Sequence, residues 1–274
     1  MLNLIKMNMY RLLKSKNFIA LIVMIVLAFT MTKVQVMVSN AESITVDEQG
    51  NMVYEVDADA IEDPGFSVMD LFVSFPGEMT ALFMTVFAIV YCENERKNGF
   101  VKNLSVSKRE KPLVFAAKIA PVFTFAVLLQ LCAFIGVLLA TLSYKSVSFG
   151  DVVPVLKYVG VETLLFTAFG MFSMAVYELF RKNVPAIILG TFTAIGLTGQ
   201  IVVLIQLGLN KLGILSDSFC EKFVLAENFI STRINVISPS DLAGGKTPAI
   251  VIGGVGLVLY IVAGMALYGK KDVV

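Results

Sequence analysis

Long apolar runs of about 20 to 26 residues alternate with short polar segments along almost the whole chain. A helix rises ~1.5 Å per residue, so each run is long enough to cross the ~30 Å hydrocarbon core of a bilayer. The predicted transmembrane helices cover residues 18–38, 69–92, 119–142, 155–180, 184–209 and 247–268. Pro76-Gly77 is expected to break the second of these near its outer end. Hydrophobic residues make up 57% of the chain and charged residues 16%, which is outside the usual range of soluble domains. We therefore expect an all-α membrane protein with one transmembrane domain over residues 1–274.

Lys and Arg are distributed unevenly between the polar segments. If the segment before residue 18 is cytoplasmic, 15 of the 22 basic residues fall on the cytoplasmic side. The other seven are Lys33, Lys145, Lys157, Lys211, Lys222, Arg233 and Lys246. Because segments rich in Lys and Arg beside a span stay in the cytoplasm, we expect both termini to be cytoplasmic.

The numbers of cysteine and histidine residues exclude several classes of site. The three cysteines, at positions 92, 132 and 220, fall on different sides of the predicted membrane, so no structural disulfide is expected. The absence of histidine argues against His-ligated metal or haem sites and Ser-His hydrolases. The triplet Gly245-Lys246-Thr247 has Ser240 where a phosphate-binding loop needs its first glycine, so no nucleotide site is expected there.

Residues 1–16 have the pattern of an amphipathic helix. Their apolar face is Leu2, Ile5, Met9, Leu12 and Leu13. Lys and Arg on the other face favour a helix that lies in the headgroup plane. The alternative is a charged cytoplasmic extension of the first span, which we interpret as a retained span rather than a cleaved signal peptide.

The predicted outer segments have two distinct patterns. Residues 39–67 carry eight acidic and no basic residues, and a Gly-containing turn at residues 47–51 separates two arms rich in β-formers. This pattern predicts an extracellular β-hairpin, which is either a cation-attracting vestibule or simply a hydrated loop. In residues 210–246, a capping-box pattern precedes apolar residues at helical spacing and predicts a short amphipathic helix. That pattern consists of Ser218, Glu221, Phe219, Phe223, Ala226 and Ile230.

Several ionisable residues lie within the predicted spans. Lys33 and Glu78 both lie ~20–24 Å along their helices from the cytoplasmic ends, so they are placed to pair, with Asp70 or Glu162 as alternative partners. Lys33, Glu78 and Glu162 are candidates for the lining of a translocation path near an outer gate. The alternative is that a snorkelling pair fixes the packing of the first two spans.

Small residues recur every four positions in the fifth predicted span. They are Ala186, Gly190, Ala194 and Thr198. Such a stripe lets a neighbouring helix approach closely, so it predicts either a homodimer interface or an internal packing face.

The segment 93–118 is the largest predicted cytoplasmic loop, and seven of its residues are basic. Glu93 and Glu95 at its start are followed by Gly99, an apolar-basic-x-leucine step, a basic turn and an Ala-Lys pair. The last three features are Val101-Lys102-Asn103-Leu104, Lys108-Arg109 and Ala117-Lys118.

This order of features resembles the permease subunits of type-2 ABC exporters, and the six spans with an amphipathic N-terminal helix are also similar to that family. The turn Ser105-Val106-Ser107 lacks the proline that many members have before the serine. The resemblance implies a cytoplasmic coupling helix that contacts a separate ABC ATPase dimer. The residues it assigns to this contact are Glu93, Glu95, Arg96, Gly99, Phe100, Lys102, Leu104, Lys108 and Arg109.

The same resemblance implies a multi-pass protein of the bacterial plasma membrane that functions with a second copy or a homologous permease, surrounded by membrane lipids. It implies a chain without catalytic residues or a cofactor of its own, since the ATPase would bind ATP and magnesium, and no nucleic-acid partner. Small bacterial members often export antimicrobial peptides, and the acidic segment 39–67 favours a cationic cargo. The alternative is a channel, or a membrane sensor or scaffold, without an ATPase.

Overall fold

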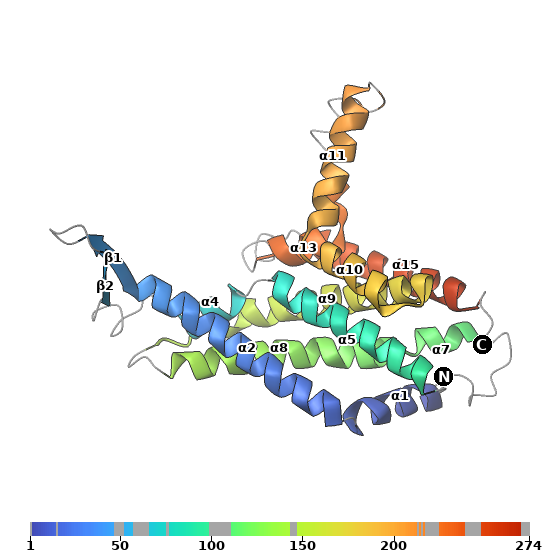
Figure 1. Ribbon diagram of the computed structural model, residues 1–274, viewed down its shortest axis with the longest axis horizontal. Coiled ribbons are helices and arrows are strands. Elements are labelled where there is room, and N and C mark those ends of the chain that lie inside the picture. Colours follow the sequence, from blue (N-terminus) through green and yellow to red (C-terminus); the bar gives the residue numbers. More distant parts are fainter. Residues whose placement is uncertain are drawn as a thin grey trace. The chain divides into compact units, whose positions relative to one another are not determined.

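The computed structural model describes residues 2–14, 16–46, 52–56, 66–74, 77–98, 111–142, 147–212, 214, 216, 225–238 and 248–269. Figure 1 shows their helices and strands in chain order. The chain divides into two compact units, which we describe separately. Unit 1 comprises Met1–Leu13, Pro76–Val127 and Lys157–Val274, and unit 2 comprises Lys14–Phe75 and Leu128–Leu156.

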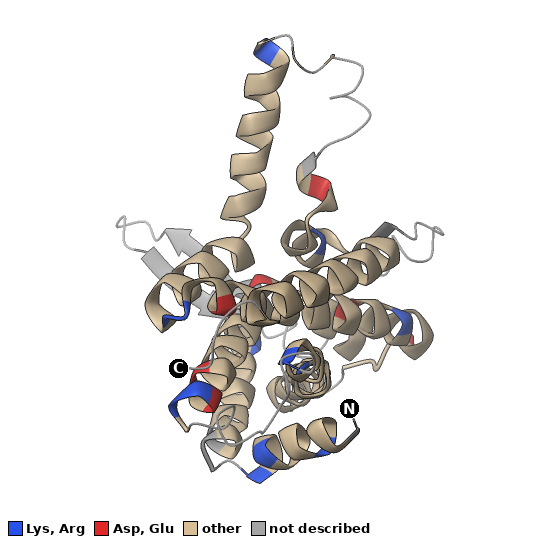
Figure 2. Cartoon of the chain, turned by 90° about the vertical axis from the view of Figure 1, so that its right-hand side faces the viewer, with Lys and Arg blue, Asp and Glu red and all other residues tan. Residues whose placement is uncertain are grey.

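Three helical segments in the described part of the chain are long and apolar enough to cross a membrane. They are Lys111–Thr141, which joins α7 (Lys111–Ala116) to α8 (Ile119–Thr141), then α9 (Val152–Phe180), and Ala249–Gly269 of α15 (Pro248–Gly269). Figure 2 shows long uncharged stretches on the helices, with charged residues mainly near the helix ends. These three helices have the length and composition of membrane spans. The prediction of six spans includes further segments that, as far as the structure describes them, do not meet both conditions as single helices.

The fifth predicted span is divided in the structure. We expected one helix over residues 184–209, but α10 (Asn183–Ala194) and α11 (Leu197–Lys211) are separate helices bent by 70° (Figure 1). Gly196 has a φ of +78°, a conformation that ends a right-handed helix and that residues with a side chain rarely adopt. If the bent pair is one span, the described residues contain four candidate spans.

In unit 1, glycine residues allow neighbouring helices to pack closely. α10 lies against α5 (Gly77–Lys97), where a Cβ on Gly190 would be 2.5 Å from Cγ2 of Thr85. At the start of α5, a Cβ on Gly77 would be 2.4 Å from the carbonyl oxygen of Ile234 in α13 (Ile230–Val236). α13 follows the short 3₁₀ helix η1 (Leu225–Asn228), and it also contacts α15. Unit 1 is therefore held by tight backbone contacts around α5.

The predicted helix of segment 210–246 differs from the described one. Residues 217–224, which include Ser218, Glu221, Phe219 and Phe223, lie outside the described residues. Ala226 falls in η1, and Ile230 begins α13. The periodic spacing therefore continues across a break between two short elements rather than along one helix.

Unit 2 contains α2 (Lys16–Ala41), α4 (Val68–Val73) and the strands β1 (Glu42–Val46) and β2 (Met52–Val56). The strands pair antiparallel, with Ile44 opposite Tyr54. Residues 47–51, between the two strands, lie outside the described residues, and the extracellular hairpin stays a prediction. α4 ends one turn before α5 begins, so the helix is interrupted at the place where Pro76-Gly77 predicted a break in the second span.

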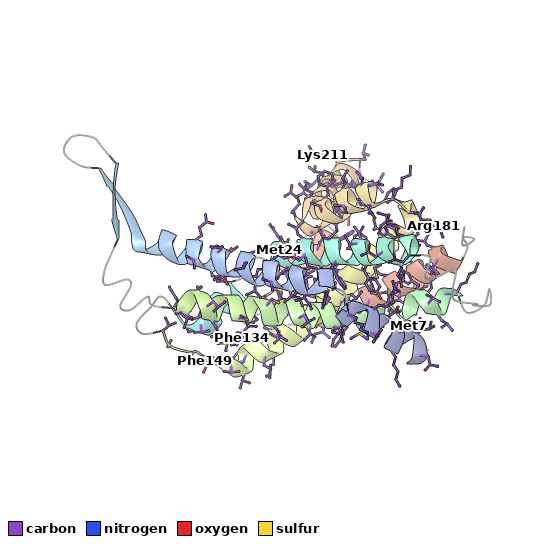
Figure 3. The ribbon with its side chains drawn as sticks, turned by 60° about the horizontal axis from the view of Figure 1, so that its bottom comes forward. Met7, Met24, Phe134, Phe149, Arg181 and Lys211 are labelled. Atoms are coloured by element: carbon purple, nitrogen blue, oxygen red, sulfur yellow. The ribbon has the colours of Figure 1, made fainter. Side chains whose placement is uncertain are left out.

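Unit 2 combines aromatic contacts with one tightly capped helix. The ring centroids of Phe134 and Phe149 are 6.4 Å apart (Figure 3), and Phe72 packs edge-on against Phe134 at 5.7 Å. Ser67 and Asp70 form a reciprocal capping box at the start of α4. Asp70, an alternative partner for Lys33 in the sequence analysis, is thereby engaged in a local structural role.

Candidate functional site

Glu95 is a fully buried carboxylate in the last turn of α5. Its side chain is 1% exposed, and Tyr91 and Cys92, one turn earlier, are buried on the same face of the helix. A buried carboxylate is costly unless it is paired. Glu95 has two basic partners, with Oε1 3.2 Å from Nη1 of Arg11 and Oε2 2.7 Å from Nζ of Lys118.

Lys118 lies in the short break between α7 and α8 and is also 1% exposed. Besides Glu95, its ammonium group lies 3.6 Å from Oε1 of Glu178 and donates to Sγ of Cys92 at 3.6 Å. The rings of Phe115 in α7 and Tyr268 in α15 lie 5.7 and 5.2 Å from Nζ, within cation–π range. One lysine therefore contacts side chains of α5, α7, α9 and α15.

Arg11 brings the N-terminal helix α1 (Leu2–Lys14) to the same place. Its guanidinium lies 5.8 Å from the ring of Tyr91, and Met9 accepts a hydrogen bond from Thr124 of α8 at 3.5 Å. Leu12 is buried, whereas Leu13 is 59% exposed. The predicted apolar face of α1 is thus divided, with one part buried and another part exposed.

The turn between α9 and α10 adds a second layer of polar contacts. Arg181, which has a φ of +51°, lies 4.0 Å from Glu178, and its carbonyl oxygen accepts a hydrogen bond from Arg96. Glu93 accepts a hydrogen bond from Tyr177 and pairs with Lys97 at 3.3 Å. The hydrogen bond from Tyr177, with the nearby cationic groups, holds the pKa of Glu93 below its ordinary value.

We call Arg11, Glu95, Lys118, Glu178 and Arg181 the Lys118 network. It contains two carboxylates and three cationic groups, and each buried charge in it has an oppositely charged partner. Breaking such a buried pair is costly, since the partner is left as an uncompensated charge. The network therefore fixes the relative positions of α1, α5, α8 and α9 within unit 1.

The network has the chemistry of a structural joint, because its buried charges are paired between helices. Among the described residues, no group of three or more His, Cys, Asp or Glu is arranged to hold a metal ion. The thiol of Cys92 is fully buried beneath Lys118. What the arrangement can do is transmit a displacement of one helix end to the others.

Three of the nine predicted ATPase-contact residues belong to this region, namely Glu93, Glu95 and Arg96. The other six lie in residues 99–110, outside the described residues: Gly99, Phe100, Lys102, Leu104, Lys108 and Arg109. Lys118 was noted in the sequence as part of the Ala-Lys pair, but its partner Glu178 was not. A signal existed, since Glu178 is an acidic residue inside an apolar run, one turn before the basic pair at 181–182.

Lys33, Glu78 and Glu162, the residues predicted to line a path, lie in different surroundings. Lys33 is buried in unit 2 and donates to Oγ of Ser74 at 3.0 Å. Glu78 is exposed in unit 1 and accepts from Nδ2 of Asn235 at 3.4 Å, and Glu162 is buried on α9. A contact between Lys33 and Glu78 would join the two units, and it stays a prediction.

The small-residue stripe faces a helix of the same chain. Ala186, Gly190 and Ala194 are buried, and Gly190 packs on Thr85 of α5. Thr198 lies beyond the bend, in α11, so the four-residue period does not continue to it on one helix. For the part in α10, the structure favours the internal packing face.

Comparison of the sequence with protein-family models and with curated proteins finds no match.

Proposed function

We propose that this chain is the transmembrane permease subunit of an ATP-driven exporter of the type-2 ABC class. In this proposal the chain crosses a bacterial plasma membrane six times with both termini inside, and segment 39–67 forms an extracellular hairpin. A separate cytoplasmic ATPase dimer binds ATP and magnesium and contacts residues 93–109. A second permease, identical or homologous, completes the transporter.

The observation that carries the proposal is the ion pair between Glu95 and Lys118. Both residues belong to the pattern that resembles the exporter permeases, one near the start of segment 93–118 and one at its end. Their side chains meet at 2.7 Å in a buried position, so the two ends of the loop are held together. A force applied to a loop anchored in this way would reach α5 and α8 at the same time.

The position of α1 gives further support. Arg11 attaches α1 to the same carboxylate that pairs with Lys118. A helix lying beside the base of the loop has the place that the resemblance gives to a connecting element next to the ATPase. The proposal therefore joins α1, the loop and the helix ends into one transmission element.

Co-purification tests the proposal. Tagged protein is extracted from its native membrane in mild detergent, and ATPase activity is measured in the eluate. A Gly99→Pro, Phe100→Asp variant alters the loop, and Leu212→Asp, at an exposed position beyond α11, is the matched control. We expect ATPase activity with the wild type and the control, and its loss with the loop variant.

Two results would contradict the proposal. If the wild type brings down no ATPase, the chain functions without one, and a channel or a scaffold becomes the better account. If the loop variant retains as much ATPase as the control, the enzyme binds elsewhere and the coupling role of the loop is wrong.

The proposed cargo is a cationic amphipathic peptide. The acidic segment 39–67 would raise the local concentration of such peptides at the outer surface. Amide replacements of Asp57, Asp59, Glu62 and Asp63 should reduce resistance of expressing cells to a cationic peptide several-fold, with ATPase co-purification unchanged. Unchanged resistance would reject the role of this segment in handling the cargo.

A further inference from the structure

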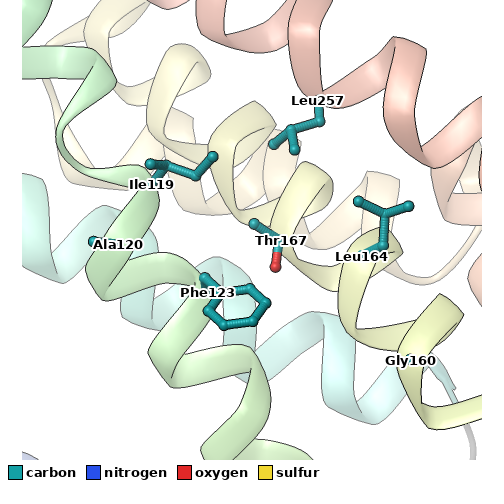
Figure 4. Close-up of a pocket in the computed structure, with 7 residues that line it drawn as sticks. All are labelled: Ile119, Ala120, Phe123, Gly160, Leu164, Thr167 and Leu257. Carbon is teal, nitrogen blue, oxygen red and sulfur yellow. The ribbon is translucent and has the colours of Figure 1, made fainter.

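An apolar groove runs between three helices of unit 1. Its lining residues are Ile119, Ala120 and Phe123 of α8, Gly160, Leu164 and Thr167 of α9, and Leu257 of α15 (Figure 4). Its volume is about 410 Å³. The hydroxyl of Thr167 donates to the carbonyl oxygen of Thr163 at 2.7 Å, so even this polar side chain is satisfied within its own helix.

The α9 side of the groove continues to a cationic residue. Lys157, Gly160, Leu164 and Thr167 are spaced by three, four and three residues, so they lie on one face of the helix. Lys157 is exposed, one turn beyond Gly160. The groove is therefore apolar along its length and has a positive charge at one end.

The length of this stripe matches one leaflet of a bilayer. From Lys157 to Thr167 the helix rises ~15 Å at ~1.5 Å per residue, which is half of the ~30 Å hydrocarbon thickness. A lysine at the headgroup level would complement the charge of a lipid phosphate, and an apolar groove reaching toward the bilayer centre would match the length of an acyl chain.

We propose that this groove binds one phospholipid, whose phosphate pairs with Lys157 and whose acyl chain lies between α8, α9 and α15. The groove would face the lipids of a bilayer, and lipid binding there does not depend on coupling to an ATPase. Lysine is a common phosphate-binding side chain, and the apolar lining would bury the acyl chain of the lipid.

Gly160 keeps one end of the groove open. A Cβ built at this position meets nothing within 4 Å, so a larger side chain fits without a clash and occupies space available to the lipid. Gly208 in α11 has the same free surroundings away from the groove. The two glycines therefore form a matched pair of positions for substitution.

The absence of tryptophan from the sequence allows a single reporter. Phe123→Trp places an indole in the groove, where Phe123 is 52% exposed, and Leu204→Trp places one on the exposed face of α11. Purified full-length protein in detergent is titrated with brominated phosphatidylglycerol and, separately, with brominated diacylglycerol, which lacks the phosphate. We expect saturable quenching at Phe123→Trp and only weak, non-saturating quenching at Leu204→Trp.

Substitutions in the Phe123→Trp background locate the lipid. Gly160→Leu should weaken binding of both lipids about tenfold or more, whereas Gly208→Leu should not. Lys157→Gln should weaken phosphatidylglycerol about fivefold, as expected for one surface cation near a lipid phosphate, and leave diacylglycerol unchanged.

The proposal is overturned if quenching at Phe123→Trp is no stronger than at Leu204→Trp. It is also overturned if Gly160→Leu binds both lipids like the wild type. An equal effect of Lys157→Gln on the two lipids would reject the phosphate contact. This comparison remains informative even if Gly160→Leu fails to fold. None of these results depends on whether an ATPase co-purifies, so the lipid site and the permease proposal can fail separately.

Discussion

Gly190 is the residue at which α10 comes closest to α5. A Cβ there would lie 2.5 Å from Cγ2 of Thr85, so one of the two helices would have to move. Alanine at this position gains ~1 kcal/mol of helix propensity over glycine, but overpacking a fitted contact costs about 1–3 kcal/mol. The steric term is the larger of the two.

Gly190→Ala is therefore predicted to lower the free energy of unfolding by about 1 kcal/mol. Thr85→Ser removes Cγ2 and retains the hydroxyl, which donates to the carbonyl oxygen of Ala81 at 3.0 Å. The double variant should recover wild-type stability in thermal unfolding in detergent. Recovery would fail if the destabilisation had another cause, and a fully stable Gly190→Ala would show that the contact is looser than described.

α1 is a short helix whose Arg11 and Met9 contact other helices of unit 1. Arg11 pairs with Glu95 while its own side chain remains 24% exposed, and Thr124 donates to Met9. An ion pair that is partly exposed contributes about 1 kcal/mol, enough to hold a short helix in place without making the attachment permanent. α1 should therefore open more easily than the helices it contacts.

Arg11→Gln should raise the hydrogen-exchange rate of the α1 amides about fivefold, because local opening becomes ~1 kcal/mol easier. Lys6→Gln, an exposed position on the same helix, is the control and should leave exchange unchanged. If the two variants exchange alike, α1 is not held by its ion pair with Glu95.

The two ends of α9 provide a test of the arrangement of the whole molecule in the membrane. Asp151 and Lys182 are exposed and lie just outside the two ends of this 29-residue helix. With Cys220 replaced by Ser, an impermeant maleimide added to intact cells should label Asp151→Cys, and it should label Lys182→Cys only after permeabilisation. Cys92 and Cys132 are buried and should react little. Equal labelling from outside, or the reverse order, would contradict the proposed topology.

The length of the apolar runs was enough to predict long helices, and Pro76-Gly77 was enough to predict the interruption before α5. The break at Gly196 was not predicted, because a glycine inside an apolar run is also common in an unbroken span. Whether Gly196 adopts a positive φ depends on the tertiary contacts of the bend rather than on its neighbours in sequence.

The candidate site was predicted only in part for a related reason. Glu95 and Lys118 stood out because they flank a polar loop, but nothing local indicates that Glu178 lies beside Lys118 or that Arg11 lies beside Glu95. The members of the last pair are 84 positions apart. Pairings over such separations are set by how the helices pack, which a single sequence does not encode in a readable pattern.

Lys118 and Glu95 form a buried ion pair that joins helix ends within unit 1. A double-mutant cycle in thermal unfolding tests it most directly, with Glu95→Gln, Lys118→Gln and the double variant. Each single change should be strongly destabilising, and the two should be coupled by at least ~1 kcal/mol, since the second change removes a buried charge that had lost its nearest partner in the first. A parallel cycle of Lys118→Gln with Glu227→Gln, at an exposed residue of η1, should be additive to within ~0.5 kcal/mol. Additivity in the Glu95 cycle would contradict the claim.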